Sequence, residues 1–276
     1  MQVEITYMSA AGNLFAVIDN RDNLLENTNL ESLAIKLCSK STNGIMDTEG
    51  LMLLENSDQY DFDCKFYNPD GSTGMMCGNG GRAIVKFASL VDQIERNSRS
   101  IKFFMANDVY EAKFAGDNIN LTMAGVKSEY EKQILIDNKT INTYFVDNGS
   151  QHAVININDL KIENLENLQI EDLGKKVRYN SAFEPNGANA NFYSYSNEVI
   201  NLRTYERGVE QETGACGTGA VATAIAANKN LGIDFPIRII PTSGDLLTIN
   251  LNKINGKKIY QLIGPAKVIN KSKFEI

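Results

Sequence analysis

The sequence predicts an α+β protein of two domains, built from mostly antiparallel sheet and a few helices. Its 276 residues suffice for two domains of ordinary size. Short apolar segments separated by turn residues recur along the chain, a spacing typical of antiparallel strands. Two stretches, starting at Cys77 and Cys216, share the pattern Cys-Gly-x-Gly followed by an apolar helical segment. Because this unit occurs twice, we expect one copy in each domain.

The first third of the chain is predicted to hold short strands and one helix. The strands are expected at residues 3–7, 15–18, 51–54 and 61–66. The helix is expected where apolar residues recur at helical spacing, namely at Leu30, Leu33, Ala34, Leu37 and Cys38. We expect Cys38 and Cys64 to pack in the core, because a free cysteine usually behaves as a small buried hydrophobe.

Short strands and a few helices are also predicted for the rest of the chain. Residues 82–91 and the segment after Cys216 are predicted helices, and 160–173 is predicted to be a helix with flanking loops. A strand is expected after Phe192. The other strands are expected at residues 101–105, 109–114, 119–123, 143–146, 153–157, 199–205, 237–240, 246–251, 259–263 and 264–269.

The charge balance excludes some classes of partner. The formal net charge is -7, and no basic run with interleaved aromatic residues occurs, so we expect a small solute and no nucleic acid. The first residues lack the pattern of a signal peptide, and no stretch has eighteen consecutive apolar residues. We therefore expect a cytoplasmic protein without a membrane partner.

Cysteine and histidine usage disfavours several kinds of site. The four cysteines, Cys38, Cys64, Cys77 and Cys216, are scattered and form no CxxC pair, so a disulfide framework is not expected. Since His152 is the single histidine, a zinc site and a Ser-His-Asp hydrolase are both disfavoured. We expect no metal, and we expect His152 to be a structural hydrogen-bonding residue.

Two cysteines at helix starts are candidates for chemistry. The free N–H groups of a helix N-terminus bind anions and favour a thiolate. Cys77 and Cys216 are then a redox pair, a coincidence of glycine-rich turns, or a two-base site, and the match in residue type and context weakens coincidence. In a two-base site one thiolate removes a proton from one face of a carbon while the other thiol delivers a proton to the opposite face. Such a reaction requires no cofactor.

The neighbouring motifs allow simpler interpretations as well. Gly78-x-Gly80-Gly81 fits neither GxGxxG nor GxxxxGK[ST], so a tight turn is expected in preference to a nucleotide site. Glu206-Arg207 is either a solvated turn or part of the site. Arg207 has a planar guanidinium that suits a carboxylate, and it lies shortly before Cys216.

Together these motifs resemble the diaminopimelate epimerase family, in the cofactor-independent amino-acid racemase group that includes proline racemase. They occur in family order along almost the entire chain. The matching landmarks are Gly12-Asn13, Gly44-Ile45, Asn68-Pro69-Asp70-Gly71-Ser72, Met76-Cys77-Gly78-Asn79-Gly80, Asn189, Glu206-Arg207-Gly208 and Glu212-Thr213-Gly214-Ala215-Cys216-Gly217-Thr218-Gly219.

The resemblance implies a fold, an activity and a set of site residues. Each domain is implied to be a curled sheet around a central helix, with the site in a cleft between the domains. The implied reaction converts LL-2,6-diaminopimelate to the meso form, in lysine and peptidoglycan precursor biosynthesis, with Cys77 and Cys216 as base and acid and with no cofactor. The implied substrate-binding residues are the backbone amides of Gly78, Asn79, Gly217 and Thr218 and the residues Asn13, Asn68, Ser150, Asn189, Glu206 and Arg207.

Domain borders and partners complete these expectations. The N-terminal domain, with Cys77, is placed at residues 1–123 plus 265–276, and the C-terminal domain, with Cys216, at residues 124–264. The family suggests a homodimer acting on a small amino-acid substrate.

Departures from the family pattern leave alternatives open. Leu14 follows Asn13 where the family usually has Asp, Ser150-Gln151 stand where it usually has Asn-Pro, and the segment 46–50 is one residue longer. The shorter Ser150 favours, as an alternative, a related racemase or epimerase for another amino acid. Alternatives of other classes are a thiol-disulfide redox protein and a catalytically silent small-molecule binding protein.

Overall fold

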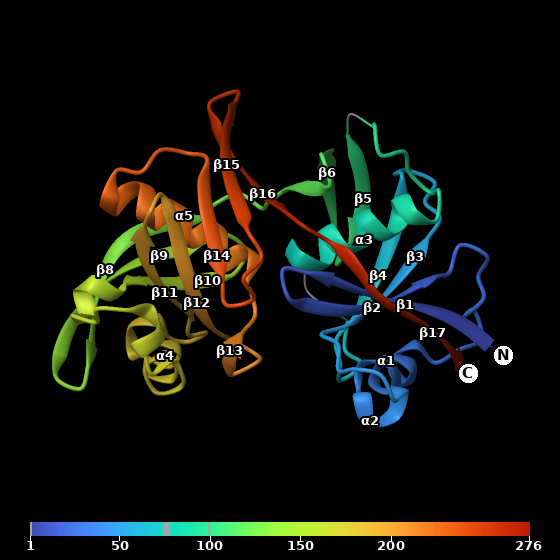
Figure 1. The fold of residues 1–276 in the computed structure, drawn as a ribbon, viewed down its shortest axis with the longest axis horizontal. Coiled ribbons are helices and arrows are strands. Elements are labelled where there is room, and N and C mark those ends of the chain that lie inside the picture. Colours follow the sequence, from blue (N-terminus) through green and yellow to red (C-terminus); the bar gives the residue numbers. More distant parts are fainter. Residues whose placement is uncertain (1, 74–77, 99) are drawn as a thin grey trace. The chain divides into compact units, whose positions relative to one another are not determined.

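The computed structural model describes residues 2–73, 78–98 and 100–276, which form two compact units (Figure 1). Unit 1 comprises Met1–Thr122 and Gly264–Ile276, and unit 2 comprises Met123–Ile263. Each unit combines a mostly antiparallel sheet with helices. The predicted α+β class with two domains is confirmed.

Unit 1 is built on one sheet with strand order β17-β1-β2-β3-β4-β5-β6-β7. All neighbouring strands are antiparallel except β2–β3 and β4–β5, which are parallel. The strands are β1 (Gln2–Ala10), β2 (Asn13–Asp19), β3 (Leu51–Glu55), β4 (Phe62–Tyr67), β5 (Ile101–Met105), β6 (Asp108–Ala115), β7 (Asn118–Thr122) and β17 (Lys267–Glu275). The helices are α1 (Leu30–Cys38), α2 (Lys40–Asn43) and α3 (Gly78–Leu90).

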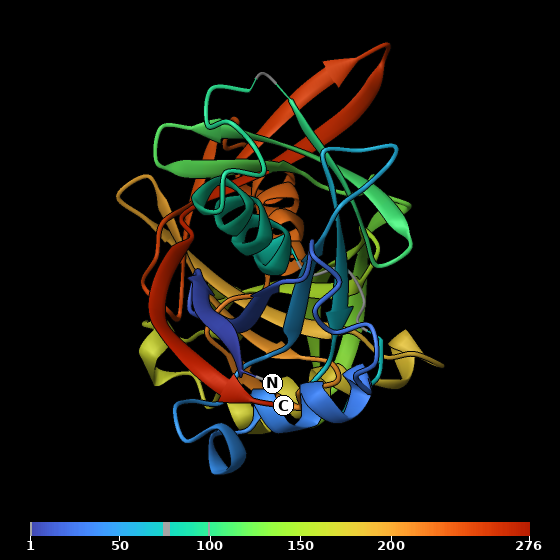
Figure 2. The ribbon, with the colours of Figure 1, turned by 90° about the vertical axis from the view of Figure 1, so that its right-hand side faces the viewer.

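Helix α3 is the centre of unit 1. It contacts β1, β2 and β3 near one end of the strand order and β6 and β7 at the other end, so the sheet curls around it (Figure 2). The other face of β1, β2 and β3 packs against α1, whose buried residues include Leu33 and Leu37. Cys38 lies in that second core, as predicted.

Unit 2 has the strand order β8-β9-β10-β11-β12-β14-β15-β16, and the short strand β13 pairs with the end of β12. The strands are β8 (Ser128–Ile136), β9 (Lys139–Asp147), β10 (Gln151–Asn156), β11 (Asn189–Ser196), β12 (Val199–Glu206), β13 (Gln211–Thr213), β14 (Ile237–Pro241), β15 (Leu247–Ile254) and β16 (Lys257–Gly264). The helices are η1 (Ile157–Leu160), η2 (Leu165–Asn167), α4 (Ile170–Arg178), η3 (Ser181–Phe183) and α5 (Gly217–Leu231).

The two units share one plan. In unit 2 the pairs β10–β11 and β12–β14 are parallel and the rest of the order is antiparallel, so parallel pairs occur at the same places as in unit 1. Helix α5 contacts β9, β10 and β11 as well as β14 and β15, and it occupies the place that α3 has in unit 1. Each parallel pair is joined through a helix: α1, α3, α4 or α5. Strand spacing alone did not predict these four crossovers, which parallel pairing requires.

One helix differs from its prediction. The segment expected as a helix with flanking loops over 160–173 begins at the last residue of the 3₁₀ turn η1 and contains the 3₁₀ turn η2, and α4 begins only at Ile170. The side chain of Asn156 accepts a hydrogen bond from the backbone N–H of Asn158 and caps η1, and Lys161 ends it in the left-handed region. Asparagine side chains compete in this way with continuous helix.

Candidate active site

Cys216 stands at the start of the buried helix α5 as its N-cap residue. The residue is 6% exposed, and its Sγ lies 3.4 Å from Oγ1 of Thr218. The first helical N–H groups lack intrahelical partners and carry the positive end of the helix dipole. The amides of Gly217 and Thr218 therefore lie in a first turn suited to binding an anion.

Close packing explains the second glycine of this turn. A Cβ built on Gly219 would lie 2.5 Å from Oδ1 of Asn191 and 3.3 Å from Sγ of Cys216. The 2.5 Å approach to Asn191 leaves no room for a side chain unless the buried Asn191 amide shifts. The glycine thus keeps the thiol and a buried amide side by side at the helix start.

A carboxyl group lies next to this thiol. Glu206, the last residue of β12, accepts a 2.9 Å hydrogen bond from Oγ1 of Thr213. Burial raises the pKa of the Glu206 carboxyl, while hydrogen bonds with Thr213 and with Cys216 oppose that rise. The Cys216 thiol and the Glu206 carboxyl are therefore direct neighbours within unit 2.

His152 is fully buried beside the same network. Burial, and then the positive charge of Arg207, lower the pKa of His152 to about 3, against a smaller opposing effect of Asn191. The ring is therefore neutral at physiological pH. Asn191 Nδ2 lies 3.1 Å from Nδ1 of the ring and donates to it, which leaves the ring proton on Nε2. Oδ1 of Asn191 accepts from Oγ1 of Thr204 at 3.1 Å, so this unpredicted asparagine fixes both β10 and β12.

Asn189 joins three predicted parts of the site. Its Nδ2 donates to Oγ of Ser150 and to the carbonyl of Gln151, both at 2.9 Å, and its Oδ1 accepts from the backbone N–H of Arg207 at 2.8 Å. The structure thus brings Ser150, Asn189 and Arg207 together. Among the residues that the structure describes, none forms a hydrogen bond or ion pair with the Arg207 guanidinium.

Sequence reasoning missed a further residue of this half. Asn148 is 2% exposed, and its Nδ2 donates to the carbonyl of Thr218 at 2.9 Å. This bond ties the turn before Ser150 to the first turn of α5. The sequence shows an Asn-Gly pair at this place, but such pairs are common in turns and do not by themselves indicate a site. In the structure the glycine, Gly149, has a φ of +100°.

Unit 1 carries a second polar network at the start of α3. Asn79 Nδ2 donates to Oδ1 of Asn13 at 2.5 Å, and Asn13 Nδ2 donates to the carboxylate of Glu49. Asn13 and Asn79 are 3% and 0% exposed. Cys77, predicted to be catalytic, lies outside the described residues and directly precedes Gly78 in the sequence.

The buried cation of this network is Arg82, which is 0% exposed. Its Nη2 donates to Oδ1 of Asn79 at 2.8 Å, and its Nη1 donates to the carbonyl of Gly78 at 3.3 Å. The sequence motifs did not mark Arg82, because it follows the glycines inside a helix whose other residues are mostly small or apolar. A charged residue on such a helix was the available signal, since arginine is rarely buried without a partner.

The remaining predicted residues form no hydrogen bond with these networks within the part of the chain that the structure describes. Asn68 belongs to a turn and donates to Oγ of Ser72 at 2.9 Å; within the described residues it has no hydrogen bond to Asn13 or Asn79. Cys38 and Cys64 are buried, and burial raises the pKa of both thiols, to about 11 for Cys38. Both are therefore neutral at physiological pH.

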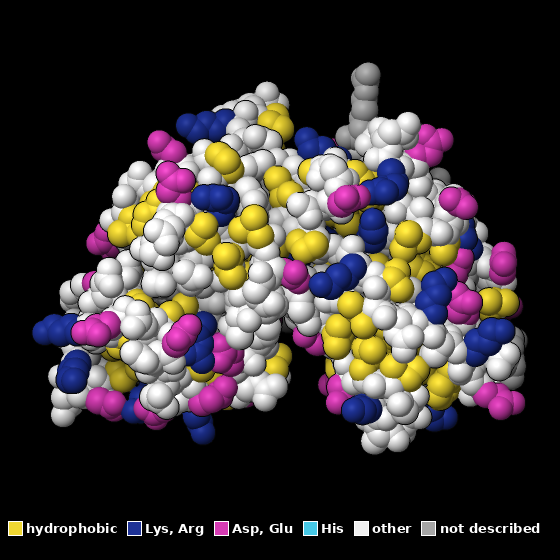
Figure 3. Space-filling model, viewed as in Figure 1, with side chains coloured by type: hydrophobic (Ala, Val, Ile, Leu, Met, Phe, Trp, Pro, Cys, Tyr) yellow, Lys and Arg dark blue, Asp and Glu magenta, His cyan; other side chains and the backbone are white. Residues whose placement is uncertain are grey.

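Three further observations bear on partners. On the face shown in Figure 3, basic and acidic side chains are interspersed. The part of the chain that the structure describes contains no group of three or more His, Cys, Asp or Glu residues able to hold a metal ion. None of its helices is long and apolar enough to cross a membrane.

Solved structures share this two-domain fold. A hydroxyproline epimerase from Agrobacterium vitis matches with a TM-score of 0.69 and 14% identity, covering 99% of this chain and 92% of the other. The phenazine biosynthesis protein of the PhzF family from Bacillus anthracis matches with a TM-score of 0.72 and 12% identity over the full length of both chains. At such low identity these matches define the fold class: two α+β domains of like topology.

Sequence comparison gives the family. The diaminopimelate epimerase model matches residues 5–130 and 144–269. A diaminopimelate epimerase from Chlorobaculum tepidum is 37% identical over 266 residues, covering 95% of this chain and 97% of the relative, and one from Aquifex aeolicus is 34% identical over 263 residues, covering 91% of each. The chain belongs to the diaminopimelate epimerase family, and the resemblance seen in its motifs is confirmed.

Proposed function

We propose that this protein is an isomerase that interconverts LL-2,6-diaminopimelate and meso-2,6-diaminopimelate. The observation that carries the proposal is the position of Cys216 as the N-cap residue of a buried helix, in a chain of this family. The reaction moves one proton at one α-carbon. It serves lysine and peptidoglycan precursor biosynthesis.

The proposed catalytic groups are two thiols that exchange roles. One of Cys77 and Cys216, as thiolate, takes the α-proton, and the other, as thiol, gives its proton to the opposite face of the carbon. At the end of a turnover the first sulfur holds the proton and the second is the thiolate, so the reverse reaction starts from the product state. Proton count and charge balance without a cofactor.

Charge at the reacting carbon needs stabilisation while the proton is absent. Negative charge then spreads from the α-carbon into its carboxylate, and donors placed for that charge lower the barrier. We assign this role to the backbone amides of Gly78 and Asn79 at the start of α3 and of Gly217 and Thr218 at the start of α5. The positive end of each helix dipole favours such negative charge.

The distal end of the substrate is assigned to polar residues of both units. These residues are Asn13, Asn68, Ser150, Asn189, Glu206 and Arg207. The unpaired guanidinium of Arg207, among described residues, suits the distal carboxylate as a two-bonded fork. Glu206 lies against the Cys216 thiol, so we assign it to the reacting side as well.

Cellular context follows from the same proposal. A metabolic isomerase of a free amino acid is expected in the cytoplasm, and we propose a homodimer without nucleic-acid or membrane partners. Gel filtration with light scattering of the purified chain measures the assembly directly.

The experiment that tests the activity is a substrate panel. The purified chain is incubated with LL-diaminopimelate, lysine and proline separately, and each stereoisomer is resolved by chiral chromatography. We expect meso-diaminopimelate from the first and no racemisation of the other two. Racemisation of lysine or proline without any meso-diaminopimelate would overturn the substrate and leave only the reaction type.

A further inference from the structure

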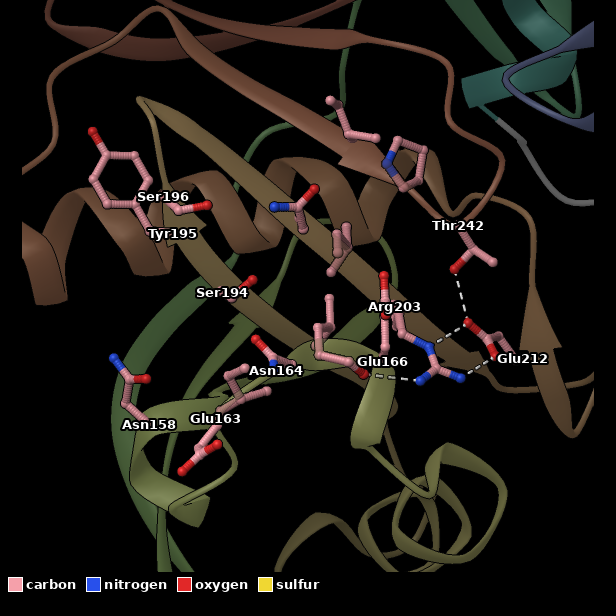
Figure 4. Close-up of a pocket in the computed structure, with 16 residues that line it drawn as sticks. Asn158, Glu163, Asn164, Glu166, Ser194, Tyr195, Ser196, Arg203, Glu212 and Thr242 are labelled. Carbon is pink, nitrogen blue, oxygen red and sulfur yellow. Dashed lines mark hydrogen bonds and ion pairs between the residues drawn. The ribbon is translucent and has the colours of Figure 1, made fainter.

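A bidentate ion pair between Arg203 and Glu212 lies at the start of the segment that carries Cys216. Nε of Arg203 donates to Oε1 of Glu212 at 2.8 Å, and Nη2 donates to Oε2 at 2.7 Å (Figure 4). The two side chains are 21% and 19% exposed. They line the wall of a pocket of about 910 Å³ in unit 2, formed by β11, β12 and η2.

The pair joins several segments of the chain. Nη1 of Arg203 donates to the carbonyls of Leu165 and Leu168, both at 3.0 Å. Glu212 Oε1 also accepts from Oγ1 of Thr242 at 2.8 Å. The 3₁₀ turn η2, β12, β13 and the loop after β14 therefore meet at one charge-assisted cluster, in which both carboxylate oxygens have partners.

Strand geometry connects this cluster to the thiol. Glu212 and Thr213 are neighbours on β13, so their side chains point to opposite faces. Glu212 meets Arg203 on one face, while Thr213 donates to Glu206, the neighbour of Cys216, on the other. A sideways shift of Glu212 would therefore move the Glu206 contact as well.

The short strand needs such support. β13 has three residues and pairs with β12 alone among the described strands. Beyond it, the carbonyl of Gly214 accepts from the backbone N–H of Ser243 at 2.9 Å, next to Thr242. The segment from Glu212 to Cys216 is thus fixed at its start by Arg203 and Thr242 and in its middle by Ser243.

We propose that Arg203 and Glu212 are positioning residues that fix the Cys216 segment for proton transfer. Neither touches the reacting atoms, and the catalytic consequence rests on the proposed function. A displacement of about 1 Å in a catalytic group costs on the order of a hundredfold in rate. The Arg203 hydrogen bonds also hold the pKa of Glu212 below its usual range, which keeps the pair charged at physiological pH.

Unit 1 offers a matched control pair. Arg21 forms the same two-bonded fork with Asp19, at 2.8 Å and 2.5 Å, and donates to the carbonyl of Val91. The side chains are 25% and 33% exposed. Neither residue contacts a site residue. Variants of this pair therefore measure how much the loss of any partly buried bidentate ion pair lowers activity and stability.

The test compares Glu212→Gln and Arg203→Lys with Asp19→Asn and Arg21→Lys. Glu212→Gln preserves shape, and Arg203→Lys preserves charge but loses the fork. Each variant is measured for kcat and KM with LL-diaminopimelate, for thermal unfolding, and for the rate of Cys216 alkylation by iodoacetamide across pH 6–9, followed by peptide mass spectrometry. Alkylation needs no turnover, so it tests the positioning role even if the wild-type chain does not isomerise diaminopimelate.

The expected result separates the two pairs. The Arg203 and Glu212 variants lower kcat about tenfold or more with KM changed by less than about threefold, because a misplaced thiol impairs the transition state more than ground-state binding. Their Cys216 alkylation rate differs from that of the wild type by at least about threefold within pH 6–9. In the control variants, neither kcat nor the alkylation rate differs from the wild-type value by more than about twofold. Equal effects of both pairs, or unchanged alkylation with normal kcat in Glu212→Gln, would overturn the proposal.

Discussion

The two domains have the same strand plan and helix placement, yet their helix starts are chemically opposite. In both, a cysteine precedes a glycine-rich first turn, and the fifth residue after it is Arg82 in unit 1 and Val221 in unit 2. Arg82 is a fully buried cation bonded to Asn79. Unit 2 instead buries the Glu206 carboxyl and the neutral ring of His152 near Cys216.

The difference shows how a duplicated fold can serve an asymmetric reaction. A racemisation with two bases needs one thiolate and one thiol at the same time. A buried cation favours the anion, and a neighbouring carboxyl disfavours it. The two helix starts therefore differ in the buried charge they carry, although the two folds are equivalent.

The largest effect is expected from removing either thiol. Cys77→Ala and Cys216→Ala each remove a group that carries a proton in the reaction, so kcat for diaminopimelate is expected to fall by roughly a thousandfold or more. Stereoisomer formation by chiral chromatography measures this fall, and circular dichroism checks the fold.

The other two cysteines provide the control. Cys38→Ala and Cys64→Ala remove buried thiols that are neutral at physiological pH, and turnover is expected to stay near that of the wild type. Substantial turnover in Cys77→Ala or Cys216→Ala would mean that one thiol suffices. The claim that each half supplies one catalytic thiol would then be wrong.

The next effect concerns the residue at which the two helix starts differ. Arg82→Met leaves the side chain of Asn79 without its cationic donor, and kcat/KM is expected to fall about a hundredfold, since Asn79 and Asn13 lose their alignment. Val221→Ala, at the equivalent place in unit 2, is expected to lower kcat/KM by less than about fivefold, because it removes only packing. A similar loss in both variants, measured at matched thermal stability, would show that Arg82 has no special role.

A smaller effect is expected at the distal end of the substrate. Arg207→Lys keeps the charge but loses the planar fork, and kcat/KM for diaminopimelate is expected to fall about tenfold, or roughly 1.4 kcal/mol of transition-state stabilisation. Ser150→Asn restores the usual family residue and is expected to be neutral or favourable. Unchanged diaminopimelate turnover in Arg207→Lys, with faster racemisation of lysine or proline, would assign the chain another substrate.

The smallest change is expected at His152, where the prediction is an absence of titration. With a folded pKa of about 3 and an unfolded value near 6.5, the ring stays neutral in the folded protein, and its contribution to stability is complete above pH 6.5 and is lost as pH falls below it. The single histidine gives one imidazole signal in NMR spectra. A titration midpoint near 6 in that signal would show that unit 2 does not exclude water from the ring.

Many of the strands and helices could be predicted from the sequence alone. Alternation along residues 61–66 and helical spacing over 30–38 predicted β4 and α1, because both signals are local. The parallel pair β4–β5 was not predicted, since pairing across the intervening α3 depends on contacts far apart in sequence. Strand β8 escaped notice because most of its residues are exposed and charged or polar.

The site shows the same division between local and distant signals. Cys216 and its glycines form one contiguous motif, so they could be identified from the local sequence. Asn191 and Arg203 act on partners in other strands and turns, such as His152 and Glu212, so no local pattern marks them. Their roles become visible only when the fold brings these partners together.

Deuterium labelling tests the central claim most directly. LL-diaminopimelate is incubated with the chain in deuterated water, and the meso product and the recovered substrate are analysed by mass spectrometry and chiral chromatography at low conversion. If Cys77 and Cys216 act as separate base and acid, the product carries one solvent deuterium at the inverted α-carbon, while the recovered substrate is essentially unlabelled. Product that retains its original proton, or deuterium entering the substrate as fast as the product, would contradict the two-thiol account.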